Sequence, residues 1–281
     1  AFAPRLSFFF NAHNNLFEEI AKFRAARRMW ARLIKDRFNA KDPLSMKLRF
    51  HTQTAGSTLT AQQPINNSVR VTIQALAAIL GGTQSLHTNS WDEAIALPKE
   101  ESVLLALRTQ QILAEESGTA DVIDPLGGSW FVENLTCELE AEALSIMEKI
   151  ENIGGVLKAL EAGFVQREIH RSAYETQKAL ESNKQIIVGV NRYAIEEIST
   201  PPPFRVREEV FREQEKRLED IHKRRSGEAA RRTLEELEKA ARGNENLLPR
   251  IYGCVEALCT IGEISDRLKV VFGAYRDPGF L

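Results

Sequence analysis

The sequence predicts an α/β protein with a parallel sheet, and a (β/α)8 barrel is favoured over an open doubly wound sheet. Two observations lead to this prediction. Short strand-like segments alternate with long amphipathic stretches over residues 6–116. Polar residues of ligand-binding type crowd the ends of the short segments, and the mouth of an α/β barrel is where such residues gather.

Three strand-and-helix pairs are expected in this first region. The predicted strands cover residues 6–10, 46–52 and 83–87, and the predicted helices cover 14–38, 62–80 and 100–116. The first helix has apolar residues at near-helical spacing opposite a face rich in Lys and Arg. Gly81 and Gly82 end the second helix. Pro98 precedes the third helix and Gly118 closes it.

The rest of the chain is predicted to be mainly helical. A turn at 124–128 precedes helices at 133–150, 155–162 and 164–182, and a short strand or extended segment follows at 186–190. Three consecutive prolines, Pro201 to Pro203, mark a linker. Opposite charges three or four positions apart over 207–242 indicate a solvated helix or helix pair. A final amphipathic helical segment is expected over 247–275.

The number of strands limits what this chain can form alone. A barrel requires eight strands, and three parallel strands leave two open edges and an uncovered interior. About half of the barrel is therefore expected upstream of residue 1, which is Ala rather than Met. The expected parts are the second half of a barrel domain (1–125), a helical extension flanking the barrel (126–200) and a charged helical C-terminal region (201–281).

Composition excludes several classes of protein. The formal net charge of −2 provides no field to attract nucleic acid or an anionic membrane. Cys137, Cys254 and Cys259 have neither metal-site spacing nor the pattern of a disulfide framework. No apolar run approaches the roughly 20 residues that cross a bilayer, and no signal peptide is visible. We expect a cytoplasmic protein without nucleic-acid or membrane partners.

Side chains two positions apart on a strand project from the same face. This rule pairs Arg5 with Ser7, as groups that could hold a phosphate or a carbonyl oxygen, and His51 with Gln53. Gln84 belongs to a polar segment, 83–89, with polar groups on both faces. The three groups are expected at equivalent ends of successive strands. Each also has a structural interpretation, such as a surface ion pair for Arg5 or a hydrogen-bonded structural role for His51.

Nine short segments occur in an order that is specific although each is modest alone. They are PRLSFF at 4–9, FRAAR at 23–27, HTQTAG at 51–56, LTAQ at 59–62, GTQSLHTN at 82–89, DEA at 92–94, ESG at 116–118, DPLGGS at 124–129 and VGVN at 188–191. Together they closely resemble the large, catalytic subunit of the methylmalonyl-CoA mutase family, over roughly residues 1–195. The end of the chain is similar to mutases whose B12-binding domain is a separate small subunit.

The resemblance implies an isomerase that uses adenosylcobalamin and interconverts (R)-methylmalonyl-CoA and succinyl-CoA by a radical rearrangement of the carbon skeleton. The implied partners are an acyl-CoA substrate, the upstream half of the barrel, a B12-binding small subunit and further copies in an oligomer. The family's catalytic residues belong to the upstream half, so those of this protein remain unknown, and the chain alone is expected to be inactive.

Specific residues take roles through the resemblance. Arg5 and Ser7 match residues that contact the CoA substrate, and His51, Gln53 and Gln84 match residues that line the substrate and corrin cavity. Gly56, Glu93 and Ala96 match residues that lie against the cofactor, with Glu93 toward the adenosyl ribose. An arginine suits the anionic CoA tail, and glycine permits a close approach to a flat macrocycle. Ser57 departs from the family's large hydrophobic residue, which puts local packing against the corrin in doubt.

No metal ligand is expected in this chain. Asp220-Ile221-His222 matches the start of the D-x-H-x-x-G motif that supplies the cobalt-ligating histidine in B12-binding domains, but the sixth position is Arg225 and the surroundings are a charged helix. The cobalt ligand is therefore expected on a separate B12-binding domain or subunit. Two alternatives stay open: another acyl-CoA mutase (isobutyryl-, ethylmalonyl- or 2-hydroxyisobutyryl-CoA), or a non-catalytic scaffold fragment derived from a mutase.

Overall fold

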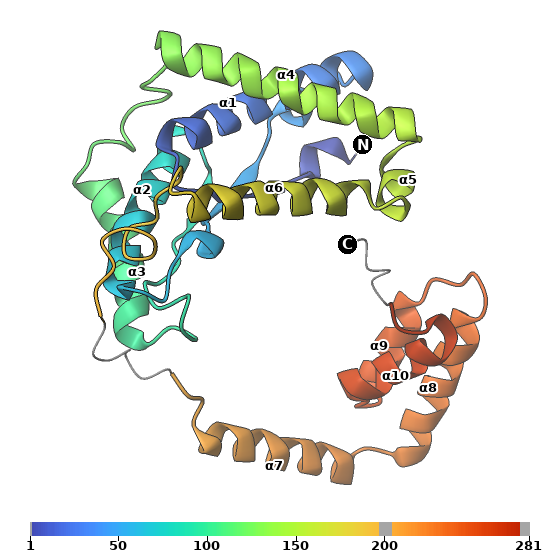
Figure 1. Ribbon diagram of the computed structural model, residues 1–281. Coiled ribbons are helices and arrows are strands. Elements are labelled where there is room, and N and C mark those ends of the chain that lie inside the picture. Colours follow the sequence, from blue (N-terminus) through green and yellow to red (C-terminus); the bar gives the residue numbers. More distant parts are fainter. Residues whose placement is uncertain (1, 197–203, 276–281) are drawn as a thin grey trace. The chain divides into compact units, whose positions relative to one another are not determined.

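Three parallel strands form one sheet in the order β1-β2-β3. They are β1 (Phe8–Ala12), β2 (Phe50–Thr54) and β3 (Ser85–His87). Phe9 is opposite His51 in the register, and His51 is opposite Ser85. The computed structural model describes residues 2–196 and 204–275 of the chain (Figure 1). Parallel strands require crossover connections, and here these connections contain helices.

One face of the sheet is buried by the first two long helices, α1 (Leu16–Arg32) and α2 (Asn67–Leu80). Phe23 of α1 is fully buried, and its ring stacks on Phe50 with centroids 5.2 Å apart. Phe10 meets both rings edge-on. Along β2, Phe50, Thr52 and Thr54 are buried while the residues between them are only partly buried. The period-two pattern thus gives the sheet one core face and one open face.

Four further helices complete the first part of the chain. They are α3 (Glu100–Glu115), α4 (Trp130–Ile153), α5 (Val156–Glu161) and α6 (Phe164–Glu181). In Figure 1, α4 lies along α1. The two helices are joined by ion pairs, of which Arg24 to Glu133 and Arg28 to Glu140 are the shortest. α1 ends in a π-helical turn, Leu33–Arg37.

A second compact unit is formed within residues 205–280, the first lying within 1–204. Its helices are α7 (Glu208–Arg224), α8 (Gly227–Ala241), α9 (Leu248–Glu256) and α10 (Ile261–Phe272). Leu234, Leu237, Cys254 and Ile264 form its core. The charged stretch predicted as a helix or helix pair is therefore a pair, α7 and α8. The last predicted segment is likewise two helices, and Thr260 caps the second of them.

The helices lie close to their predicted positions, whereas the strands are displaced toward the C-terminus. β1 begins two residues later than predicted because Pro4 lies in a 3-10 turn, Ala3–Arg5, that precedes it. A second 3-10 turn, Pro43–Met46, delays β2 in the same way.

Two other segments complete the comparison with the predicted elements. The segment 186–190, predicted as a short strand or an extended segment, contains no regular strand, and its Val188 forms an isolated bridge with Arg192. Pro201 to Pro203, the predicted linker, lie outside the described residues. Within the described part of the chain, no helix is long and apolar enough to cross a membrane.

Candidate functional site

The open face of the sheet carries two rows of side chains. Phe9, His51 and Ser85 form the first row across the three strands, and Asn11, Gln53 and His87 form the second. His51 Nδ1 lies 2.7 Å from Ser85 Oγ, and the Phe9 ring lies 5.2 Å from the His51 ring. Phe9 is 60% exposed. An apolar ring and several hydrogen-bonding groups thus face solvent together, as expected of a surface that meets another part of a protein or a ligand.

At the carboxyl end of β2, three predicted site residues come together. Gln53 Nε2 donates to Asn89 Oδ1 over 3.0 Å. A Cβ on Gly56 would lie only 2.7 Å from Asn89 Nδ2 and 3.4 Å from Glu93 Oε1, so a larger residue here would have to displace the Asn89 side chain. The resemblance predicted Gln53, Gly56 and Glu93 in one cavity, and the Gln53 and Glu93 side chains and the Gly56 backbone do lie together beside Asn89. Asn89 itself was not among the predicted site residues.

The loop after β3 contains two buried polar atoms without hydrogen-bond partners among the described residues. They are Asn89 Nδ2 and Asp92 Oδ1, a donor and an acceptor. The other oxygen of Asp92 accepts from Ser102 Oγ over 2.8 Å and from the Lys99 amide, which fixes the start of α3. Ala96 follows in the same loop, and its amide donates to the Asp92 carbonyl. Buried polar groups are rarely left unpaired in folded proteins, so these two atoms are candidates for contact with a ligand or water.

Arg5, Ser7 and Gln84 lie at the amino end of the strands, which corrects the expectation that all the candidates share one end of the sheet. Arg5 is exposed in the 3-10 turn before β1, so the period-two relation with Ser7 does not apply to it. Gln84 precedes β3, and its amide group bonds to the Phe50 amide and the Gly82 carbonyl. The candidates therefore occupy both ends of the sheet rather than equivalent ends, because Arg5 and Gln84 precede their strands whereas Gln53 lies near the carboxyl end of β2.

Gln74 of α2 is a second residue that the sequence analysis did not select. Its side chain is fully buried, and its Nε2 donates to Asn14 Oδ1 over 2.5 Å and to Thr58 Oγ1 over 2.7 Å. Its Oε1 accepts from the Ala55 amide. One amide therefore holds the loops after β1 and β2. The available signal was an amide within the apolar, buried stripe of a helix, between Val71 and Ala78.

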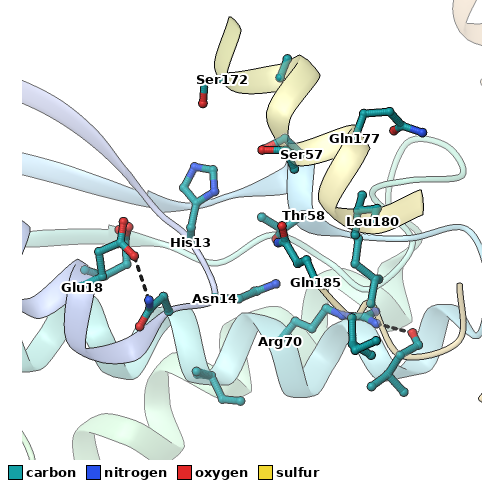
Figure 2. Close-up of a pocket in the computed structure, with 18 of the residues that line it drawn as sticks. His13, Asn14, Glu18, Ser57, Thr58, Arg70, Ser172, Gln177, Leu180 and Gln185 are labelled. Carbon is teal, nitrogen blue, oxygen red and sulfur yellow. Dashed lines mark hydrogen bonds between the residues drawn. The ribbon is translucent and has the colours of Figure 1, made fainter. Parts of the chain in front are cut away.

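Beside these loops lies a large pocket of about 1550 Å³. Figure 2 shows His13 and Asn14 from the loop after β1, Ser57 and Thr58 from the loop after β2, and Ser172 and Gln177 from α6 around it. The side chains of Val69, Ile73 and Ile169 make much of its lining apolar. The pocket thus adjoins Gly56, at the carboxyl ends of two parallel strands, where α/β proteins usually bind ligands.

Arg70 attaches the segment 188–193 to α2 at one side of this pocket. It donates to the Val188 carbonyl over 2.7 Å and to Asn67 Oδ1 over 2.7 Å. Desolvation by burial lowers the pKa of Arg70. The VGVN segment predicted from the resemblance is held further by Asn191, whose side chain bonds to the backbone at Ile187 and Leu180.

The described residues contain no cluster of three or more His, Cys, Asp or Glu side chains that could hold a metal ion. His222 is exposed in the last turn of α7. Arg225, the residue that breaks the cobalt motif, forms a paired salt bridge with Glu263, with both N···O distances 2.7 Å. This arginine therefore has a structural partner in the second unit.

Parallel strands joined through helices, with polar side chains on an open sheet face and at the strand ends, define an α/β domain with candidate ligand-binding groups. Comparison with known proteins identifies the family to which this domain belongs. The chain belongs to the methylmalonyl-CoA mutase family, whose family model matches residues 1–274.

Three relatives illustrate the range of the family. The 2-hydroxyisobutanoyl-CoA mutase large subunit of Aquincola tertiaricarbonis is 45% identical over 98% of this chain and 50% of its own length. The methylmalonyl-CoA mutase of Escherichia coli K12 is 43% identical over 99% of this chain and 39% of its own length. The methylmalonyl-CoA mutase large subunit of Propionibacterium freudenreichii subsp. shermanii is 44% identical over 98% of this chain and 38% of its own length. The chain spans half or less of the length of these relatives.

Proposed function

We propose that the chain is the C-terminal half of a (β/α)8-barrel domain in the catalytic subunit of an acyl-CoA mutase. The observation that carries the proposal is the open sheet face with its two rows, since in a closed barrel this face would be the interior. The proposed parts are the half barrel over 1–125, a flanking extension over 126–200 and a charged helical region over 201–281. The upstream half would pair with the free edges of β1 and β3.

The proposed reaction is the interconversion of (R)-methylmalonyl-CoA and succinyl-CoA. The relatives named as methylmalonyl-CoA mutases support this substrate, and the relative named as a 2-hydroxyisobutanoyl-CoA mutase supports the alternative substrate. Isobutyryl- and ethylmalonyl-CoA remain further alternatives because the upstream half would supply much of the substrate cavity. The alternative to an active mutase subunit is a non-catalytic scaffold derived from a mutase.

The substrate is proposed to run along the strands of the open face. Arg5, Ser7 and Gln84 lie at the amino end of the sheet, and Gln53 lies at the carboxyl end, with His51 between them. A five-residue strand is about 16 Å long, which suits an elongated thioester such as acyl-CoA. The exposed guanidinium of Arg5 would bind the anionic tail, and His51 and Gln53 would orient the acyl end.

The carboxyl end of β2 fits the proposed cofactor, adenosylcobalamin. The unpaired Asn89 Nδ2 and Asp92 Oδ1 offer a donor and an acceptor to a ligand rich in hydroxyl and amide groups. Gly56, Glu93 and Ala96 would lie against it, and its cobalt ligand would come from a separate B12-binding domain or small subunit. When bound, this cofactor supplies the radical that starts the rearrangement. The chain's own residues orient the substrate and exclude water.

Activity in the assembled protein tests this proposal. The full-length catalytic subunit, combined with its B12-binding domain or subunit, should convert methylmalonyl-CoA to succinyl-CoA, and the 281-residue chain alone should not. Parallel assays with 2-hydroxyisobutanoyl-CoA decide between the two substrates. An assembly that binds adenosylcobalamin but isomerises no acyl-CoA would contradict the proposal and favour the scaffold.

Cofactor binding gives a second test that does not depend on turnover. In the assembled protein, Gly56→Ala should weaken adenosylcobalamin binding at least tenfold, because its Cβ would displace Asn89 and Glu93. Gly253→Ala in α9 is the matched control, since an added Cβ there meets nothing within 4 Å. Absorbance titration measures the dissociation constant of adenosylcobalamin for each variant. Equal affinities for the two variants would argue against a cofactor site beside Gly56.

A further inference from the structure

Two cysteines lie side by side in the core of the second unit, and the backbone at the end of α9 places them there. The Cys259 amide donates to the Cys254 carbonyl over 2.9 Å, and the Leu258 amide donates to the Val255 carbonyl over 3.0 Å. Leu258 has a φ of 59°, in the left-handed region. These two bonds and this turn form a Schellman motif, which brings the side chains on either side of the turn, here Cys254 and Cys259, into contact.

The two thiols differ in their access to solvent. Cys254 is fully buried, whereas Cys259 packs against the same core and remains partly exposed. The Cys259 sulfur lies 3.6 Å from the Ala230 carbonyl oxygen and 3.7 Å from Thr233 Oγ1. Burial is the main cause that raises the pKa of the Cys254 thiol, and the contact with Cys259 raises it further. A reagent from solvent therefore meets Cys259 first, while Cys254 stays protonated beside it.

We propose that Cys254 and Cys259 are a modification site that forms a reversible disulfide on reaction with a peroxide. Cys259 loses its proton and attacks one peroxide oxygen, which leaves a sulfenic acid on Cys259 and releases water with that proton. The Cys254 sulfur then attacks the sulfenic sulfur, and its proton leaves with the departing hydroxide as a second water. Two thiols and one hydrogen peroxide thus give one disulfide and two waters.

The backbone geometry permits this bond. Because Cys254 and Cys259 share a backbone hydrogen bond, their Cα atoms lie within about 7 Å, the limit that a disulfide bridges. The sequence pattern excludes a permanent disulfide framework, and a transient bond is what a reducing compartment allows. The inference concerns the second unit alone and does not depend on the proposed function.

The bond would stabilise the second unit. It closes the short loop 254–259 and so restricts the unfolded chain more than the folded one, in which the Schellman motif already holds the turn. Oxidation should therefore raise the temperature at which this unit unfolds by about 4 °C or more.

Peptide mass spectrometry of the assembled full-length protein tests the inference. Trypsin cleaves after Arg250 and Arg267, so both cysteines are recovered in one peptide, residues 251–267. After treatment of the folded protein with hydrogen peroxide and then iodoacetamide, this peptide should carry no alkyl group and should be lighter by two hydrogen atoms. Dithiothreitol should restore both alkylation sites. A peptide that stays reduced, or that only gains oxygen, would overturn the inference.

Cys137 is the matched control in the same digest. It is an exposed thiol of α4, and no other cysteine of this chain belongs to its unit. Without a neighbouring thiol, its peptide should gain oxygen on treatment with peroxide rather than form an internal disulfide. If Cys254 and Cys259 gained oxygen as Cys137 does, the Schellman contact between them would have no chemical consequence, and the proposal would fail.

Two variants test the order of the steps and the effect on stability. In Cys254→Ala, dimedone should trap the sulfenic acid of Cys259. In Cys259→Ala, the buried Cys254 should react on the order of tenfold more slowly, since buried cysteines are inert. Equal trapping in the two variants would contradict the assigned order. Calorimetry should show the rise in unfolding temperature in the parent protein and in neither variant. A rise that persists in Cys259→Ala, which alters only a partly exposed side chain, would mean that the disulfide is not its cause.

Discussion

Gln74 is the residue whose replacement should disturb the site most strongly without touching any ligand. Gln74→Leu keeps a similar volume but removes two donated hydrogen bonds and one accepted bond, and it leaves the exposed Asn14 and the half-buried Thr58 without this partner. Each of the three hydrogen bonds contributes about 0.5–1.5 kcal/mol net. We expect a loss of about 2–4 kcal/mol in the free energy of unfolding, measured by urea denaturation followed through tryptophan fluorescence.

Gln62 supplies the control for that measurement. Its side chain is exposed, and its backbone carbonyl rather than its amide group accepts a bond, from Thr60. Gln62→Leu should change the free energy of unfolding by no more than about 0.5 kcal/mol. Similar losses for the two variants would mean that the burial of Gln74 contributes nothing specific.

The sequence alone predicted the site residues only where local rules apply. Gln53 and Gly56 are close in sequence and follow one strand, so their proximity could be expected. Asn89 meets Gln53 from 36 positions away, and Gln74 meets Ala55 from 19 positions away. Such pairings depend on how α2 and the β3 loop pack, which hydrophobic periodicity does not describe.

At the scale of elements, the packing of α4 on α1 depends on a ladder of ion pairs. Glu140 is 6% exposed and accepts from Arg28 over 2.5 Å and from Arg32 over 2.9 Å. Removing one partner of a buried pair leaves the other charge uncompensated. Since Arg28 and Arg32 are partly exposed, solvent reduces this cost. We expect Glu140→Ala to lower the free energy of unfolding by about 1–3 kcal/mol, measured by urea denaturation.

The same two helices offer a matched pair at the surface. Arg37 and Glu151 lie 2.9 Å apart, and both side chains are more than half exposed. Glu151→Ala should therefore cost less than about 1 kcal/mol. A loss as large as that of Glu140→Ala would mean that burial does not determine the strength of the ladder.

The start of α10 is stabilised by a carboxylate whose effect depends on pH. Glu263 accepts from Arg225 and from the amide and hydroxyl of Thr260, and hydrogen bonding from Arg225 is the main cause that lowers the pKa of Glu263 from 4.5 to about 2. A lowered pKa in the folded state stabilises the protein above pH 4.5, and this stabilisation is lost as the pH falls toward 2.

Glu263→Gln should therefore be less stable than the parent protein at pH 7. The difference in urea midpoint should shrink between pH about 4.5 and about 2 and disappear below that range, the window set by the two pKa values. Glu256→Gln, an exposed position of α9, should show no such trend. A difference that stays constant down to pH 2 would contradict the assignment.

The helices could be predicted better than the strands for a physical reason. Long amphipathic stretches such as residues 67–80 repeat their pattern over several turns, so one atypical residue does not obscure it. β3 has only three residues, and its limits depend on hydrogen bonds to β2 that the local sequence does not contain. The 3-10 turns at Pro4 and Pro43 displaced the strand starts, although proline before a strand is a recognisable signal.

At the scale of the whole molecule, each unit has its own hydrophobic core. Phe23 is fully buried against the sheet in the first unit, and Leu237 is fully buried between the helices of the second. Units with separate cores can unfold separately, in which case a single midpoint does not describe the protein. We therefore expect two cooperative transitions in calorimetry, one for each unit.

Two core substitutions assign these transitions. Leu237→Ala removes buried apolar groups from the second unit at a cost of about 2–5 kcal/mol, and Phe23→Ala removes a stacked ring from the first at about 3–5 kcal/mol. Leu237→Ala should lower the temperature of one transition only, and Phe23→Ala should lower the other only. Hydrogen exchange confirms which amides are released in each transition. If either substitution shifted both transitions equally, the two units would fold as one cooperative body, and stability measured at Glu263 would then report on the sheet as well.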